Sequence, residues 1–310
     1  MYFIRGGIIA LGVFFLVYVA LSLLVGVGWR ALRRDRRRVS SAMAYGLRIL
    51  PLAAALVVVA AFTVPSFLRF EPRWDDEPMG SAVLALASAG AVILIFGIIN
   101  ALLAWMRTSR SVSSWTSDSR TLELEATVPA FQTPESAPLL AVAGLCRPKL
   151  LVSGCARRLL DPGELDVAIR HELAHVRSRD NLKKLLLRAS AFPFLGALER
   201  AWLEAAEINA DDEAVTDERS ALDLASALLK ASRLSPHILG PELAMDLVSG
   251  APGAVAARVE RLLSWTPRVR RQRRLLPIAV PAAVVAVMAA GLAYTWVLAR
   301  VHQFTEFLVR

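Results

Sequence analysis

Two histidines stand four residues apart, with a glutamate directly after the first, in the segment His171-Glu172-Leu173-Ala174-His175. Residues four apart share one face of a helix, so both imidazoles can point at a single ion. Neutral imidazole nitrogens are good ligands for Zn²⁺. Glu172 can reach a water molecule at the ion without being a ligand itself, as a general base must. The alternative is a pair of surface histidines on a charged helix, but the chain holds only four histidines, which favours a metal site.

A third ligand is required, because a catalytic zinc site usually has three protein ligands and one open position. The best candidate is Glu207, on a later predicted helix that could fold back antiparallel to the first. Asp211 shares the face of Glu207 and could accept the free ring N–H of a ligating histidine. Asp180 could brace the active-site helix or a ligand, and its alternative role is a solvent-exposed ion pair. The acidic stretch is also typical of a solvated helix face, and it contains three rival ligands, Glu204, Asp212 and Glu213.

The helix that carries both histidines has a clear predicted start. Asp161 supplies an N-cap carboxylate, Pro162 occupies the first helical position, and Glu164 completes a capping box. Apolar residues then recur at helical spacing, at Leu165, Ala168, Ile169 and Val176. The two histidines fall off this stripe, so we expect them to line a cleft rather than the main core.

The composition indicates a multispanning membrane protein. The 310 residues are 55% hydrophobic, and the mean hydropathy is +0.48. The net charge of +9 is concentrated in two arginine clusters, at 30–38 and 268–274, each with a net charge of +5. The rest of the chain therefore has a net charge of −1, which disfavours a nucleic-acid partner, because such binding requires a basic patch on a folded domain.

Four apolar stretches are long enough to cross about 30 Å of hydrocarbon, at 8–27, 49–68, 82–106 and 275–299. The arginine clusters follow the first stretch and precede the last, so the positive-inside rule places them in the cytoplasm. We therefore expect a multi-pass protein of the cell (inner or plasma) membrane, surrounded by lipid. Residues 1–107 form its N-terminal membrane domain, 108–274 a cytoplasmic domain, and 300–310 an external tail, with both termini outside.

The cytoplasmic domain is predicted to be mainly helical with a small β-sheet, which makes the chain an α+β membrane protein. A serine-rich linker at 109–120 is followed by strands at 121–128, 138–145 and 149–153, and later helices at 202–215, 221–234 and 254–265. Residues 182–198 are an interfacial segment or an ordinary buried helix, and 240–253 a loop with a short helical piece. Leu150, Leu151 and Val152 are the candidate edge strand for pairing with an extended substrate, with an ordinary core strand as the alternative.

Together these residues resemble the antirepressor-type membrane metallopeptidases, the family of the β-lactam sensor-transducers, and more distantly the heat-shock and prenyl-protein membrane zinc peptidases. The matching residues are Arg147-Pro148, His171 to His175, Arg179-Asp180-Asn181, Glu207 with Ala210-Asp211, and Arg258 before Leu262-Leu263. The resemblance implies a zincin-like, gluzincin-type domain with one zinc ion per chain, bound by His171, His175 and Glu207. It also implies that Glu172 is the base and that the protein cleaves a protein substrate at the cytoplasmic side of the membrane. We expect regulatory proteolysis of a repressor-type substrate, with an anti-sigma factor or a misfolded membrane protein as the alternatives.

The sequence differs from the sensor members of that family in one respect. They carry a large extracellular penicillin-binding domain after the last span, whereas this sequence ends at Arg310. We therefore expect no direct antibiotic sensing, and a signal would come through the spans, the external loop or a sensor partner. The alternative function is a non-catalytic membrane receptor or scaffold that retains a zinc-binding fold. The presence of all three ligands and the base argues against it.

Overall fold

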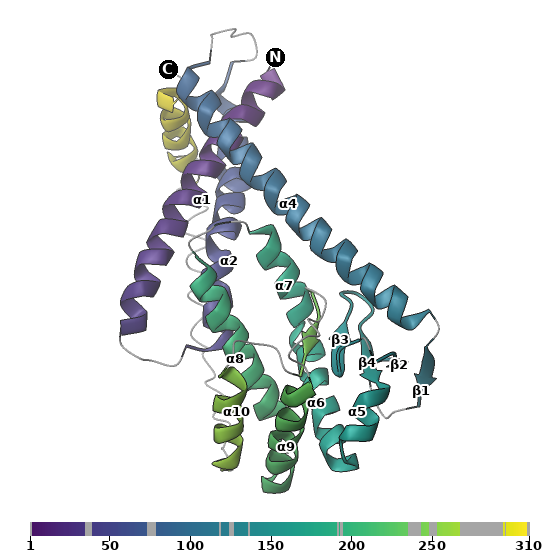
Figure 1. Ribbon diagram of the computed structural model, residues 1–310. Helices are drawn as coiled ribbons and strands as arrows, with labels where there is room; N and C mark the ends of the chain where they lie inside the picture. The colour runs from purple at the N-terminus through teal and green to yellow at the C-terminus, as the bar shows by residue number, and fades with distance from the viewer. Residues whose placement is uncertain are drawn as a thin grey trace. The chain divides into compact units, whose positions relative to one another are not determined.

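The computed structural model is mostly helical, with one small mixed sheet (Figure 1). It describes residues 2–34, 39–72, 79–117, 119–123, 127–135, 137–190, 192, 195–234, 243–247, 253–266, 294 and 296–308. The chain divides into two compact units. The first unit comprises Met1–Asp35, Ile49–Phe96 and Arg268–Arg310, and the second comprises Arg36–Arg48 and Gly97–Pro267.

Among the described residues, three apolar helical segments are long enough to cross a membrane, and they coincide with the first three predicted spans. They are α1 (Tyr2–Arg34), then α2 (Ser41–Val58) continued by the π-helical turn η1 (Val59–Thr63) and α3 (Val64–Phe70), and then α4 (Ser81–Thr116). Within the first unit, α4 approaches α1 closely at Gly90, where a Cβ atom would lie 2.5 Å from the carbonyl oxygen of Leu11. Glycine is therefore required at this contact. The predicted fourth span, 275–299, lies mostly outside the described residues, apart from Tyr294 and a helix that begins at 296.

Pro65 interrupts the second apolar segment, and a tyrosine compensates for the lost hydrogen bond. Proline has no N–H, so the α-helical bond from residue 65 to the carbonyl of Ala61 cannot form. The hydroxyl of Tyr294 donates to that carbonyl at 2.6 Å. Ser66 also donates to the carbonyl of Leu298 at 2.9 Å. The helix near the C-terminus therefore packs on the second apolar segment through polar contacts that satisfy the backbone.

The sheet of the second unit has five short strands in the order β1-β2-β4-β3-β5. They are β1 (Arg120–Leu122), β2 (Ala130–Thr133), β3 (Leu140–Ala143), β4 (Lys149–Ser153) and β5 (Met245–Asp246). Only β2 and β4 are parallel, and the other neighbours are antiparallel. The small sheet agrees with the prediction, but the predicted strand at 121–128 covers only β1, and β2 was not predicted. The described residues 243–247 contain β5 rather than a helical piece.

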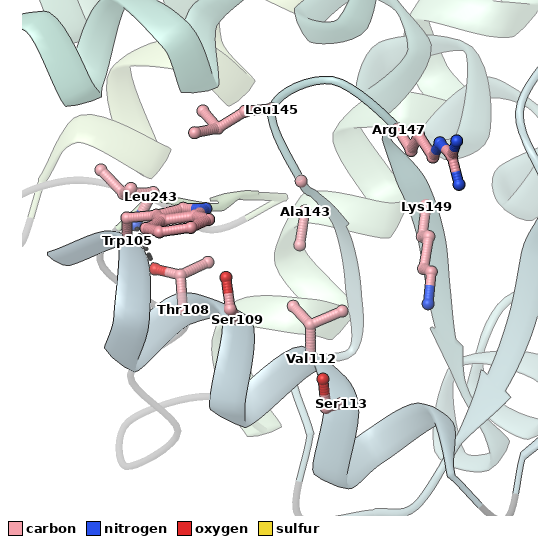
Figure 2. A pocket seen from close by; sticks show the side chains of 11 residues that line it. Trp105, Thr108, Ser109, Val112, Ser113, Ala143, Leu145, Arg147, Lys149 and Leu243 are labelled. Atoms are coloured by element: carbon pink, nitrogen blue, oxygen red, sulfur yellow. Dashed lines mark hydrogen bonds between the residues drawn. The ribbon is translucent and has the colours of Figure 1, made fainter. Parts of the chain in front are cut away.

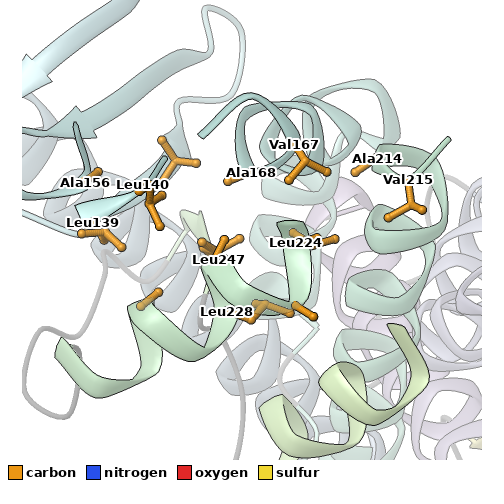
Figure 3. Packing of buried hydrophobic residues seen from close by; sticks show 14 of the residues in the cluster. Leu139, Leu140, Ala156, Val167, Ala168, Ala214, Val215, Leu224, Leu228 and Leu247 are labelled. Atoms are coloured by element: carbon orange, nitrogen blue, oxygen red, sulfur yellow. The ribbon is translucent and has the colours of Figure 1, made fainter. Parts of the chain in front are cut away.

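Both faces of this sheet are covered, because successive residues of a strand point to opposite sides. On one face, Leu151 packs with Ala143 and with Val112 of α4, and Figure 2 shows the last two. On the other face, Leu150 and Val152 join the main core, and Figure 3 shows Leu140 there beside residues of later helices. An apolar run without alternation, as in β4, is what a strand buried on both faces requires.

The predicted serine-rich linker at 109–120 is wrong over most of its length, because α4 continues to Thr116. Ser114 and Thr116 donate to the carbonyls of Ser111 and Val112, so these side chains bond within the helix instead of ending it. Burial of Val112 against the sheet then favours the helical continuation.

The remaining helices of the second unit are α5 (Gly154–Leu159), α6 (Pro162–Ser178), α7 (Asp180–Ala189), α8 (Gly196–Ala214), α9 (Glu218–Leu234) and α10 (Ala254–Leu263). The predicted start of α6 is confirmed, with a capping box between Asp161 and Glu164. Glu164 also accepts hydrogen bonds from Ser226 and Lys230 of α9, which fixes α9 against the first turn of α6. The stretch 182–198 contains the end of α7, which is too short to cross a membrane.

The contact between Tyr294 and Ala61 predicts a double-mutant cycle. Tyr294→Phe removes the donor and leaves the Ala61 carbonyl unsatisfied, at an expected cost of about 1–2 kcal/mol in the free energy of unfolding. In a Pro65→Ala background the new backbone N–H can take over, so the same substitution should cost less than half as much. Denaturant titration in detergent micelles measures both costs. Equal costs in the two backgrounds would show that Pro65 does not create the requirement for Tyr294.

The Glu164 capping network predicts a pH dependence. Burial by itself would raise the pKa of Glu164, but hydrogen bonds from Lys230 and Ser226 lower it below the ordinary 4.5. A carboxylate with a lowered pKa contributes stability above pH 4.5 and loses it as the pH falls through the folded-state value. Glu164→Gln should therefore lower stability by about 1 kcal/mol at pH 7, and the difference from wild type should shrink below pH 4.5. A constant difference across this range contradicts the assignment.

Candidate metal centre

Helix α6 presents His171, Glu172 and His175 on one turn, and all three side chains are buried. The helix ends at Arg179, whose φ of 54° is in the left-handed region. This turn allows α7 to begin at the next residue, Asp180. The Nδ1 atom of His175 then lies 2.8 Å from Asp180 Oδ2. The corner between α6 and α7 thus places a carboxylate directly behind the second histidine.

Helix α8 packs beside α6 and carries two carboxylates one turn apart, Glu207 and Asp211. Asp211 Oδ1 lies 3.0 Å from His171 Nδ1. Since a carboxylate can only accept, the Nδ1 atom that faces it must carry the proton in each histidine, although Nδ1 of His171 has no well-directed hydrogen bond among the described residues. When neutral, as a metal ligand must be, both histidines therefore have the tautomer whose Nε2 lone pair is free.

The two free Nε2 atoms and the carboxylate of Glu207 converge. The Nε2 atoms are 3.3 Å apart. Glu207 Oε2 is 3.5 Å from His171 Nε2, and Glu207 Oε1 is 3.7 Å from His175 Nε2. These side chains are nearly inaccessible to solvent, with Glu207 the most exposed at 4%. Three acceptors thus face one another in a buried space.

This geometry fits a tetrahedral metal ion. Ligands about 2.0–2.1 Å from zinc lie about 3.3 Å from one another along a tetrahedral edge, close to the three separations given above. In addition, neither oxygen of Glu207 has a well-directed hydrogen bond among the described residues. Converging acceptors without donors are unfavourable unless a cation lies between them. His171, His175 and Glu207 are therefore suited to hold a divalent metal.

Arg258 of α10 completes the site, and the sequence did not indicate its role. Its Nε and Nη2 atoms donate to the two oxygens of Asp211, at 3.0 and 2.6 Å. Its Nη1 atom lies 2.9 Å from Glu207 Oε2 and also donates to the carbonyl of Leu247. A fork of this kind fixes both carboxylates of α8. In the sequence, Arg258 was one of the residues that carry the family resemblance, but this did not identify its partners.

The field of these charges shifts the pKa values of the metal-free site. Burial by itself would lower the pKa of His171, but the carboxylates of Asp211 and Glu207 raise it to about 9. Burial would raise the pKa values of Asp211 and Glu207, but the Arg258 guanidinium holds both below their ordinary values. Likewise, His175 and Lys183 outweigh burial and lower the pKa of Asp180. All three carboxylates are therefore ionised near neutral pH.

The rival ligands lie elsewhere. Glu204, Asp212 and Glu213 are exposed, whereas Glu207 is buried in the site. Asp212 pairs with Arg261, and Glu213 pairs with Arg177, each at 2.5 Å. Sequence periodicity could not separate these acids. It gives the face of the helix on which each residue lies, but it does not tell which face packs against the metal-binding helix.

The predicted substrate strand is wrong. Leu150, Leu151 and Val152 belong to β4, which pairs with β2 on one side and β3 on the other. Both of its edges are therefore occupied, and all three side chains are fully buried. An added strand requires a free edge, so β4 cannot accept an extended substrate. The alternative interpretation, an ordinary core strand, describes these residues.

A second group of potential ligands, Glu71, His302 and Glu306, lies in the first unit. There, the guanidinium of Arg5 lies 3.0 Å from Glu71. The lone His302 thus belongs to the first unit and the α6 histidines to the second, and His237 lies outside the described residues. The α6–α8 group is the candidate metal centre because its histidines have carboxylate partners that fix their tautomers.

The fold and the site define a class of protein: a membrane-associated chain in which a buried His-His-Glu group on two packed helices can hold a metal ion. The chain belongs to the BlaR1 peptidase M56 family, whose model matches residues 17–262. This match runs from α1 to α10 and includes every residue of the candidate centre. It confirms the resemblance drawn from the sequence and makes the protein a membrane-associated peptidase. No curated protein matches the chain closely enough to refine this assignment.

The two roles of Arg258 predict a large effect on stability. Arg258→Leu leaves Glu207 and Asp211 buried without their counter-charge, so metal-free protein should lose about 3–5 kcal/mol. Arg258→Lys keeps the charge but loses the fork, and an intermediate loss is expected. The matched control is Arg177→Gln, which removes an exposed ion pair and should cost under about 1 kcal/mol. Denaturant titration after chelation measures all three. Similar small losses for Arg258→Leu and the control would show that Arg258 does not stabilise the two carboxylates.

Proposed function

We propose that the protein is an integral-membrane zinc endopeptidase of the gluzincin type, with one zinc ion per chain. His171, His175 and Glu207 are the metal ligands in this proposal, and Glu172 is the general base. The observation that carries it is the convergence of two histidine Nε2 atoms and one carboxylate at 3.3 to 3.7 Å. The peptidase family of the chain supports the same chemistry.

The contacts indicate the role of each residue in the proposed reaction. A zinc ion held by these side chains would act as a Lewis acid on the scissile carbonyl and lower the pKa of water toward neutrality. Asp211 and Asp180 hold the ring N–H groups of His171 and His175, and so keep both Nε2 atoms available. The carboxylate of Glu172 takes the proton from the attacking water and returns it to the amine leaving group. Burial of Glu172 strengthens its electrostatic interactions with these groups.

The proposed topology retains the four predicted spans and a zincin-like cytoplasmic domain at 108–274, with both termini outside. The arginine clusters at 30–38 and 268–274 support this orientation. The contact of Tyr294 with Ala61 supports a fourth span packed on the second. Such a protein would cleave a cytoplasmic or membrane-proximal protein of the repressor type, in response to a signal received through the spans or a sensor partner.

Substituting the base and a ligand separates chemistry from metal binding. Glu172→Gln should lower the rate of peptide cleavage by at least about a thousandfold while one zinc per chain is retained. Glu207→Gln should lose both the metal and the activity. Glu204→Gln, an exposed acid of the same helix, is the control and should lose neither. The measurements are metal content by plasma mass spectrometry and cleavage of a fluorogenic peptide library by detergent-purified protein.

Two outcomes contradict the proposal. Full cleavage by Glu172→Gln excludes that residue as the base. The wild type could bind zinc but cleave nothing in a broad peptide library, and cells could show no new N-terminus that depends on Glu172. This result favours the alternative of a non-catalytic receptor or scaffold. Comparative N-terminal proteomics of cells carrying wild type and Glu172→Gln provides the second measurement and also identifies the substrate.

A further inference from the structure

Helix α4 is longer than a membrane crossing requires. Its 36 residues extend about 54 Å at 1.5 Å per residue, whereas the hydrocarbon core is about 30 Å thick. The uncharged apolar part ends at Met106, and Arg107 and Arg110 follow. The last turns of α4 pack on the sheet of the second unit through Val112. The same helix thus runs from the membrane into the folded unit.

A cavity of about 160 Å³ lies between the end of α4 and the turn that joins β3 to β4 (Figure 2). Trp105, Ser109 and Ser113 line it from α4. Arg147 and Lys149 line it from the β3–β4 turn and the start of β4. Near Trp105, the backbone N–H of Leu243 donates to Thr108 at 3.2 Å, and both residues line the cavity.

The cavity is cationic and carries hydroxyl donors. Its lining contains no acidic side chain. Elsewhere in the same unit, two exposed arginines pair with carboxylates, Arg177 with Glu213 and Arg158 with Glu135. By contrast, neither Arg147 nor Lys149 has a carboxylate partner among the described residues, and the Lys149 ammonium lies over the face of Phe131, at 5.0 Å from the ring centre. Two uncompensated cations beside serine hydroxyls form a site for an anion.

The position of the cavity along α4 indicates the source of the anion. Trp105 stands at the end of the apolar run, where tryptophan prefers the membrane–water interface. Ser109 is one helical turn further, about 6 Å along the axis. The headgroup layer of one leaflet is about 5–8 Å thick. The hydroxyl and cationic groups of the cavity therefore lie at the depth of lipid phosphates.

We propose that this cavity binds the phosphate headgroup of an anionic membrane lipid. Arg147 and Lys149 neutralise the phosphate, Ser109 and Ser113 donate hydrogen bonds to it, and Trp105 packs against the glycerol end of the acyl chains. The bound lipid bridges α4 and the β3–β4 turn, and so couples the composition of the membrane to the sheet of the second unit. This inference depends on α4 crossing the membrane and not on the proposed peptidase chemistry.

Lipid counting by native mass spectrometry tests the proposal. The full chain, in the Glu172→Gln background to exclude self-cleavage, is released from detergent and titrated with phosphatidylglycerol or phosphatidylcholine. Wild type should bind the first phosphatidylglycerol at least about tenfold more tightly than phosphatidylcholine. Arg147→Gln/Lys149→Gln should weaken this binding about thirtyfold, the factor expected from two juxtamembrane cations. Arg157→Gln/Arg219→Gln, which removes two exposed arginines outside the cavity, should leave it unchanged.

Further measurements identify the source of the anion and distinguish a loss of binding from a loss of folding. Ser113→Asp places a carboxylate at an exposed position of the cavity wall. It should weaken phosphatidylglycerol binding, as the double substitution of Arg147 and Lys149 does. Circular dichroism establishes that each variant is folded. If inorganic phosphate at 10 mM displaces phosphatidylglycerol completely, the cavity takes free phosphate and the lipid assignment is overturned. If the double variant at Arg147 and Lys149 binds phosphatidylglycerol as wild type does, the site itself is refuted.

Discussion

Two carboxylates face the Nδ1 atoms of the two histidine rings, on the side away from the Nε2 atoms. The arrangement of the second unit depends on this constraint. Asp180 accepts from His175, and Asp211 lies 3.0 Å from Nδ1 of His171. With both Nδ1 protons committed, both Nε2 lone pairs must face the same space, where Glu207 adds a third acceptor. Such a group is stable only with compensating positive charge close by. The fold must therefore bring residues of α6, α7, α8 and α10 to one place and supply that charge.

Each neighbouring element has an identifiable part in meeting this constraint. The left-handed conformation of Arg179 turns the chain so that Asp180 follows α6 at once. Asn181 then donates to the carbonyl of Val142, which attaches α7 to β3. At the other end of α7, buried Arg48 donates to both the hydroxyl and the carbonyl of Ser190. The sheet is buried on both faces, so it provides a rigid support for the helices that carry the ligands.

Local geometry explains what the sequence could predict. The face shared by His171 and His175, the start of α6 and the pairing of Glu207 with Asp211 all follow from helical spacing, and the structure places these groups together. Contacts between distant segments were not predictable in the same way. Arg258 reaches Asp211 from another helix, and the interior position of β4 depends on the order of strands rather than on its own residues. The helical continuation of α4 through a serine-rich stretch depends on burial of Val112, which only the sheet provides.

The charges of the centre explain how it can fold without an ion. Its ionised carboxylates include Asp180, Glu207 and Asp211, and Lys183, Arg258 and Arg261 lie in contact with them. The raised pKa of His171 adds a further positive charge, and a metal ion at Nε2 would displace that proton. The loss of Arg258 would leave two buried carboxylates without their counter-charge. Arg258 pairs with Glu207 through Oε2, and Oε1 remains directed at His175. The guanidinium thus stabilises the ligand carboxylate without occupying the space in which a metal ion would lie.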